Sequence, residues 1–151
     1  ILTKHNLRSD NSYLLKKLKN TNKTILKAHL SSQLSILGNR SQLEFNELIE
    51  EPAFVFAGIG DTKSLIRSTV NLGVKISGTK FFKDHHLYNK TDLKDVCRAA
   101  RVIDAKYLLT TEKDWVKIEN FTIDLPIVIL SARFKIDSKN QLNKLIEQKI
   151  N

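Results

Sequence analysis

The chain has 151 residues, 41% of them hydrophobic, which is enough to bury the core of one ordinary domain and argues against disorder. Its 25 Lys and Arg residues outnumber 16 Asp and Glu residues, and the net charge of +9 favours anionic partners such as nucleic acid, phospholipid head groups or phosphorylated substrates without choosing among them. The single Cys97 excludes an intramolecular disulfide, and because no run approaches the ~18 apolar residues that span a bilayer, any membrane contact is expected to be peripheral.

The first 50 residues are expected to hold short elements that cannot fold alone. Ile1–Lys4 is typical of the end of a buried strand, and residues 11–20 place apolar side chains at helical spacing. Thr24–Leu30 alternates as a half-exposed strand should, which suggests a connector. Residues 31–50 are polar with a turn signal at Gly38-Asn39, and we expect a second short strand there. The sequence contains no methionine, so we expect a piece of a longer protein.

From Pro52 onward, apolar strands alternate with amphipathic helices. The expected strands are residues 53–57, 74–79, 107–111 and 126–130. The expected helices begin after Asp61 or Thr62, at a Thr91 cap, at Glu112 and at Ser138. Strands alternating with helices of this length imply a mainly parallel sheet with helices on both faces. The predicted class is therefore three-layer α/β, preceded by a short β linker.

Ligands of such sheets gather beyond the carboxyl ends of the strands, so the residues just after each strand form the candidate site. The first of these loops contains Gly58 and Gly60, whose missing side chains let backbone N–H groups approach a ligand at a helix start, a favourable place for anions. A tight strand-to-helix turn explains the two glycines equally well. Neither a dinucleotide fingerprint nor a P-loop motif occurs in residues 1–151.

The second loop, residues 81–88, has the densest cluster of reactive side chains in the chain. Asp84, His85 and His86 follow one another there, and a histidine held by a carboxylate can accept and return a proton near neutral pH. Adjacent residues usually point apart, so Asp84 could instead orient another partner, cap a turn or bind a metal-associated water. The alternative is a loop whose histidines only hydrogen-bond the backbone.

The third loop, Thr110–Asp114, ends a strand and starts a short helix. Thr111 can cap that helix, and Glu112 can complement its dipole. Lys113 can reach a phosphate or pair with Asp114. Capping is the simpler interpretation of this loop.

Taken together and in this order, the three loops resemble the sequence blocks of the C-terminal domain of tetraacyldisaccharide 4'-kinases, the lipid A kinases. The matching pieces are Phe54–Gly60, then Asp84-His85-His86 with Tyr88, then Leu108–Lys117, and their spacing matches as well. The likeness is strongest over residues 50–135. The family usually has proline where this chain has Lys83, a difference that frees the loop backbone and adds a charge.

The resemblance implies transfer of the γ-phosphate of ATP to the 4'-hydroxyl of tetraacyldisaccharide 1-phosphate, in lipid A biosynthesis at the cytoplasmic face of a Gram-negative inner membrane. Such a transfer needs a P-loop, Mg²⁺ and a group that orients the attacking hydroxyl. In the family the P-loop and metal-binding carboxylates lie in an N-terminal domain, so ATP and Mg²⁺ are expected to bind mainly there, with no metal ligands in this chain. The chain alone is expected to be inactive.

The resemblance also implies residue roles, partners and boundaries. The catalytic histidine, expected to approach a carboxylate across a cleft between domains, is His85, with Asp84 beside it and His86 as the alternative. The implied substrate- or phosphate-binding residues are Gly58, Gly60, Thr111, Glu112 and Lys113. The expected partners are the lipid substrate, an anionic membrane surface and the N-terminal P-loop domain, and not nucleic acid. The expected division is residues 1–22 as the end of the nucleotide-binding domain, 23–49 as a linker, and 50–151 as the C-terminal α/β domain.

Two alternatives from other functional classes stay open. A metal phosphoesterase of the Asp-His-His kind would bind two metal ions, but it needs several further Asp-rich segments at strand ends, and the sequence shows no convincing set. A non-catalytic basic module that binds nucleic acid or anionic lipid would rest on the net charge alone. Strong, salt-sensitive DNA binding would favour that second alternative.

Overall fold

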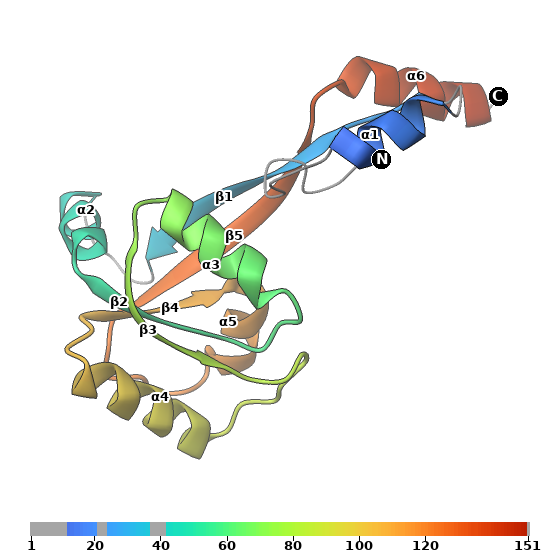
Figure 1. Ribbon diagram of the computed structural model, residues 1–151. Coiled ribbons are helices and arrows are strands. Elements are labelled where there is room, and N and C mark those ends of the chain that lie inside the picture. The colour runs from blue at the N-terminus through green and yellow to red at the C-terminus, as the bar shows by residue number, and fades with distance from the viewer. Residues whose placement is uncertain (1–11, 21–23, 37–41, 151) are drawn as a thin grey trace. The chain divides into compact units, whose positions relative to one another are not determined.

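The structure of the chain is a computed structural model that describes residues 12–20, 24–36 and 42–150. Its elements follow in the order α1 (Ser12–Lys19), β1 (Ala28–Ile36), α2 (Gln42–Glu50), β2 (Pro52–Ala57), α3 (Thr62–Asn71), β3 (Lys75–Phe81), α4 (Lys90–Val102), β4 (Tyr107–Thr111), α5 (Glu112–Ile118), β5 (Ile127–Ile136) and α6 (Lys139–Ile150) (Figure 1). The expected strand end at residues 1–4 and the turn at Gly38-Asn39 lie outside the described residues.

A sheet of five strands, in the order β1-β5-β4-β2-β3, forms the centre of the fold. Strand β2 pairs in parallel with both β3 and β4, with Ala53 opposite Tyr107, and β4 pairs in parallel with β5, with Leu109 opposite Val128. These pairings confirm the prediction of a mainly parallel sheet.

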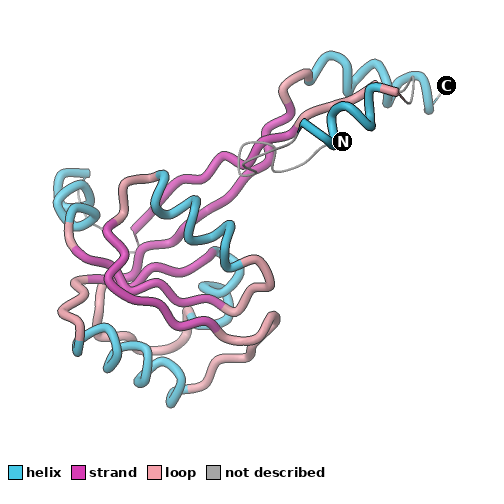
Figure 2. The backbone as a smooth tube through the Cα atoms, viewed as in Figure 1, coloured by secondary structure: helices cyan, strands magenta, loops and turns pink. Residues whose placement is uncertain are grey.

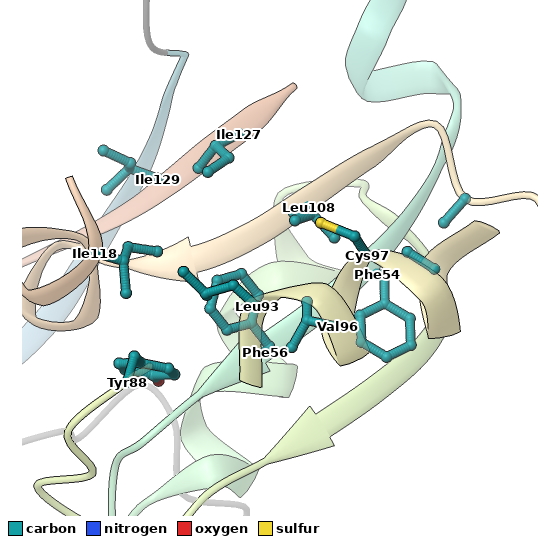
Figure 3. Packing of buried hydrophobic residues seen from close by; sticks show 12 residues of the cluster. Phe54, Phe56, Tyr88, Leu93, Val96, Cys97, Leu108, Ile118, Ile127 and Ile129 are labelled. Atoms are coloured by element: carbon teal, nitrogen blue, oxygen red, sulfur yellow. The ribbon is translucent and has the colours of Figure 1, made fainter. Parts of the chain in front are cut away.

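Helices cover both faces of the sheet. Neighbouring residues of the central strands point to opposite faces, and because these residues are apolar, both faces must be covered. Phe54 and Phe56 of β2 join a cluster with residues of α4 and α5, which Figure 3 shows packed around Leu108. Ala53 and Val55 join the cluster on the other face, against which α2 and α3 pack. Within residues 32–131, Figure 2 shows helices on both sides of the strands. The three-layer α/β class is therefore confirmed.

By its contacts the chain divides into two compact units, Ser32–Ser131 and a second unit made of Ile1–Ser31 and Ala132–Asn151. The second unit includes the first residues of β1 and the last residues of β5. Within it, the His29 Nδ1 atom lies 2.8 Å from Asp137 Oδ1. The domain boundaries expected at residues 22 and 49 stay predictions.

The expectation of a second short strand within residues 31–50 is wrong. Residues 31–36 continue β1, and Gln42–Glu50 forms the helix α2. The helix is favoured because Phe45 and Leu48, three residues apart, lie on one helical face and pack against the cluster of the sheet. The abundance of Glu and Leu in this segment also favours a helix.

The expected N-cap at Thr91 is also wrong, because α4 begins at Lys90 and its N-cap is Asn89, two residues before Thr91. The Asn89 side chain accepts hydrogen bonds from the backbone N–H groups of Thr91 and Asp92, at 2.8 and 3.0 Å. Asp92 accepts in return from the Asn89 backbone N–H at 3.0 Å. This reciprocal capping box satisfies more of the free N–H groups of the first turn than a lone threonine would.

Candidate active site at the carboxyl edge of the sheet

The chain reverses its direction of winding between β2 and β4. From β2 it passes through α3 to β3 on one side, and from β3 through α4 to β4 on the other side of β2. In open α/β sheets, ligands bind in the crevice at the carboxyl ends of the two strands that flank such a switch point. The residues that follow β2 and β4 begin with Gly58 and Glu112, so two of the three loops singled out in the sequence lie at this switch point.

Asp114 joins these two loops. Its side chain is fully buried, and its Oδ2 atom accepts hydrogen bonds from the Gly58 backbone N–H at 3.1 Å and from the Thr111 hydroxyl at 2.8 Å. Its Oδ1 atom accepts from Lys117 Nζ at 3.1 Å. A buried carboxylate is tolerated only where it is paired and hydrogen-bonded, and here both oxygens have partners.

The second loop, residues 81–88, which leads from β3 to α4, is tied to the first by the backbone of His85. The His85 N–H donates to the Gly58 carbonyl at 3.2 Å and to Asp84 Oδ1 at 3.0 Å, and the His86 N–H donates to the Lys83 carbonyl at 3.1 Å. These bonds form a tight turn in which His85 has a φ of 60°, a left-handed conformation that is uncommon for residues other than glycine. The imidazole of His85 is 76% exposed.

Asp84 lies between the imidazole of His85 and the ammonium group of Lys113. Its Oδ2 atom lies 3.8 Å from His85 Nε2, and its Oδ1 atom lies 3.6 Å from Lys113 Nζ. Desolvation acts to raise the pKa of Asp84, but the attraction of Lys113 and His85 and the His85 N–H hydrogen bond lower it below its ordinary value. Lys113 therefore pairs with Asp84 and not with Asp114 as one sequence interpretation had it, because the buried Asp114 faces Lys117.

His86 has different surroundings from His85. Its Nε2 atom lies 2.9 Å from Asp92 Oδ2, the same oxygen that completes the capping box of α4. Its ring stacks on Phe82, with centroids 4.4 Å apart and planes at 19°, and meets the Tyr88 ring edge-on at 4.9 Å. His86 thus anchors the loop to α4 and to aromatic side chains, whereas His85 faces solvent.

Tyr88 closes the inner side of the site. Its ring is buried in the hydrophobic cluster, and Lys117 Nζ lies 5.7 Å from the ring centroid. Burial, and then the negative charge of Asp114, raise the pKa of the Tyr88 hydroxyl above its ordinary value. Tyr88 therefore stays a neutral phenol, able to donate but not to act as a base near neutral pH.

Comparison with known proteins assigns the chain to a family. The family model described as tetraacyldisaccharide-1-P 4'-kinase, LpxK, matches residues 1–151. The chain belongs to this kinase family. That assignment confirms the resemblance drawn from the three loops and sets aside the phosphoesterase interpretation of Asp-His-His.

Curated relatives agree with the family assignment. A tetraacyldisaccharide 4'-kinase of Chlorobaculum tepidum is 32% identical over 73% of this chain and 31% of its own length, and one of Rickettsia canadensis is 34% identical over 64% and 29%. The chain thus spans about a third of the length of these LpxK relatives. A crystal structure described as the "apo" form of LpxK from Aquifex aeolicus in complex with ATP covers 81% of this chain and 36% of its own, with 22% identity and a TM-score of 0.47.

The structure brings most of the residues singled out for their LpxK likeness to one place. Gly58, Asp84, His85 and Lys113 are linked by the contacts above. Gly60 lies beside them, since a Cβ atom on it would be 3.4 Å from Asp84 Oδ2.

The remaining candidates have structural places of their own. Thr111 is the N-cap of α5 and accepts from the Asp114 N–H at 3.1 Å, as predicted, and Glu112 is exposed in the first turn of that helix. Sequence reasoning missed Asp92 and the central place of Asp114. Only the Asn-x-x-Asp spacing of a capping box could have pointed to Asp92. Among the described residues, no group of three or more His, Cys, Asp and Glu side chains is arranged to hold a metal ion.

Proposed function

We propose that this chain is the C-terminal part of a tetraacyldisaccharide 4'-kinase, an enzyme that transfers the γ-phosphate of ATP to the 4'-hydroxyl of tetraacyldisaccharide 1-phosphate. The observation that supports it best is the joining of three loops at the switch point of the sheet, with the solvent-facing His85 at their outer side. The names of the relatives, which are tetraacyldisaccharide 4'-kinases, support the same activity.

In this proposal His85 orients the attacking 4'-hydroxyl and can take up its proton. A general base must come within hydrogen-bond reach of the proton it removes, and an exposed imidazole can do so when a substrate enters. The carboxylate of Asp84 lies 3.8 Å from this imidazole. Lys113, which is half-exposed, supplies positive charge for a phosphate oxygen. His86 supports the loop and does not touch substrate.

The residues present here do not by themselves fit ATP and Mg²⁺. Residues 1–151 contain no Gly-x-x-x-x-Gly-Lys-Ser/Thr segment, which is the motif that cradles nucleotide phosphates. The N–H of Gly58, at the loop that follows β2, is directed to Asp114 and not outward. In the part of the chain that is described, no set of three carboxylate or imidazole ligands is available to a metal ion. We therefore assign nucleotide and metal binding to the part of the kinase outside these 151 residues.

It follows that the chain alone does not phosphorylate the lipid. The test is transfer of labelled γ-phosphate to tetraacyldisaccharide 1-phosphate, measured with the full-length enzyme, with its His85→Ala variant and with the 151-residue chain. We expect turnover by the full-length enzyme, a fall in kcat larger than the rise in KM for the variant, and none for the chain. A full-length enzyme without turnover would refute the proposed activity. A variant that changes KM alone would make His85 a substrate-binding residue.

The proposal includes peripheral binding to the cytoplasmic face of the bacterial inner membrane. In the ranges that the structure describes, no helix is both long enough and apolar enough to cross a bilayer. The observation that supports membrane contact is a hollow of about 580 Å³ beside α4, whose lining includes the apolar Leu93 and Cys97 and the basic Lys90 and Lys94. Arg101 also lines it, and its guanidinium pairs with the lining carboxylate of Asp124 at 3.1 Å. Such a combination of apolar and cationic side chains suits the phosphate head groups of acidic lipids.

A further inference from the structure

We infer that Asp114 is a positioning residue of the kinase, which fixes the backbone of His85 through Gly58. This inference rests on the proposed function, in which His85 meets the substrate. Asp114 itself is fully buried and cannot touch substrate in this structure.

The connection from Asp114 to His85 runs through the two backbone polar groups of a single residue. The Gly58 N–H donates to Asp114 Oδ2 at 3.1 Å, and the Gly58 carbonyl accepts from the His85 N–H at 3.2 Å. Gly58 therefore has one partner in the loop after β4 and another in the loop after β3. A shift of Asp114 changes where the Gly58 carbonyl lies, and His85 follows.

The side of Gly58 on which a side chain would stand is closed by neighbouring residues. A Cβ atom there would lie 3.1 Å from His86 Cβ, 3.2 Å from the Lys83 carbonyl oxygen and 3.2 Å from the Tyr88 hydroxyl. Only a residue without a side chain fits here, and its two hydrogen bonds, to Asp114 and from His85, hold the backbone of Gly58. Such support is needed because the left-handed conformation of His85 is unfavourable by itself.

The charge of Asp114 matters for this role, because three donors converge on its two oxygens. Gly58 and Thr111 donate to Oδ2, and Lys117 donates to Oδ1. An asparagine has one acceptor oxygen and one NH₂ group, so its NH₂ must face either the Gly58 and Thr111 donors or the Lys117 ammonium. No orientation of an asparagine satisfies all three donors. Asp114→Asn should therefore loosen the site while changing the side-chain volume very little.

The experiment is amide hydrogen exchange of the 151-residue chain, followed residue by residue by NMR. In Asp114→Asn we expect the His85 and Gly58 amides to exchange about tenfold or more faster, the effect of losing one hydrogen bond worth about 1.4 kcal/mol. The amides of Val55 and Leu109, in the middle of β2 and β4, should change less than about twofold. The matched control is Asp61→Asn, which neutralises a carboxylate of the loop after β2 that accepts from Ser64.

Two results would overturn the inference: an unchanged His85 amide in Asp114→Asn, or an equal acceleration of all four amides, which would make Asp114 a general stabiliser of the fold. If Asp114→Asn does not fold, the double variant Asp114→Asn with Lys117→Met removes the unpaired ammonium. The exchange rates of the same four amides in that variant then test the inference. The exchange result does not depend on kinase activity. In the full-length enzyme Asp114→Asn should lower kcat with KM little changed, and an inactive wild-type enzyme would refute the proposed function while leaving the exchange result standing.

Discussion

The backbone N–H of Gly58 donates a hydrogen bond of 3.1 Å to the buried Oδ2 atom of Asp114, 56 residues further along the chain. This bond joins the loops that follow two neighbouring parallel strands, at the point where the winding of the chain reverses. His85 and Asp92 lie within a few contacts of this bond, whereas Lys90 and Lys94 line the hollow beside α4.

Gly58→Ala should destabilise the chain by about 1–2 kcal/mol, because the added methyl group would come within 3.1–3.2 Å of three atoms that cannot all move away. Gly60→Ala is the matched control, since the nearest atom to its added methyl group is Asp84 Oδ2 at 3.4 Å, an ordinary contact. Urea unfolding followed by the fluorescence of the single Trp115, which packs against the core cluster, measures both variants. Equal stabilities of the two variants would contradict the prediction.

His85→Gly should raise the free energy of unfolding by about 0.5–1 kcal/mol, because glycine adopts a φ of 60° without the steric cost that histidine bears. His85→Ala keeps that cost and should not share the gain. The same two variants of the full-length enzyme should both lose turnover, so that stability and activity separate. If alanine stabilises the chain as much as glycine, the gain does not come from the backbone conformation.

Asp92 should make the stability of the chain depend on pH in the acid range. Desolvation acts to raise its pKa, but the hydrogen bonds from His86 and from the Asn89 backbone lower it below the value of 3.8 that an unperturbed aspartate has. A lowered pKa in the folded state adds stability above pH 3.8 that is lost as the pH falls through the folded pKa. The advantage of wild type over Asp92→Asn should therefore shrink on acidification below about pH 4. Thermal unfolding at a series of pH values measures it, and His86→Phe should weaken the effect.

Lys90→Glu combined with Lys94→Glu should weaken binding of the chain to phosphatidylglycerol vesicles by at least about 30-fold, because each basic residue near an acidic surface contributes ~1 kcal/mol. Both lysines line the hollow beside α4, and neither forms an ion pair with any residue that the structure describes. Lys63→Glu with Arg67→Glu, on α3, changes the net charge equally at the same helical spacing and serves as the control. Vesicle co-sedimentation compares the two double variants. Equal losses would mean that net charge alone governs binding.

The sheet and its helices α3, α4 and α5 could be predicted from the sequence, because the central strands are buried on both faces and each of these three helices buries residues against them. Phe54 and Val55, for example, are neighbours in one apolar run and belong to the clusters on opposite faces. The helix α2 could not be predicted in this way. Its short segment is mostly polar, and the contacts of Phe45 and Leu48 with a sheet formed by later residues favour the helix.

The site could be predicted as a set of loops but not as a network. The rule that ligands bind after the carboxyl ends of strands placed Gly58, His85 and Lys113 together correctly. The pairing of Lys113 with Asp84, and of Asp114 with Gly58, depends on which strands are neighbours in the sheet. Local spacing favours partners a few residues away, so it suggested Asp114 for Lys113 and could not find a partner 56 residues distant.

Tyr88 belongs at once to the core cluster and to the loop that presents His85. Its ring meets Phe56 edge-on, with centroids 6.0 Å apart, so the loop is fastened to the interior by an aromatic side chain of its own. An attempt to transplant residues 81–92 into another α/β protein would therefore fail unless the recipient also offered a cavity for this ring. A transplanted segment without Tyr88 would keep the Asp-His-His sequence, but the loop would lose its conformation.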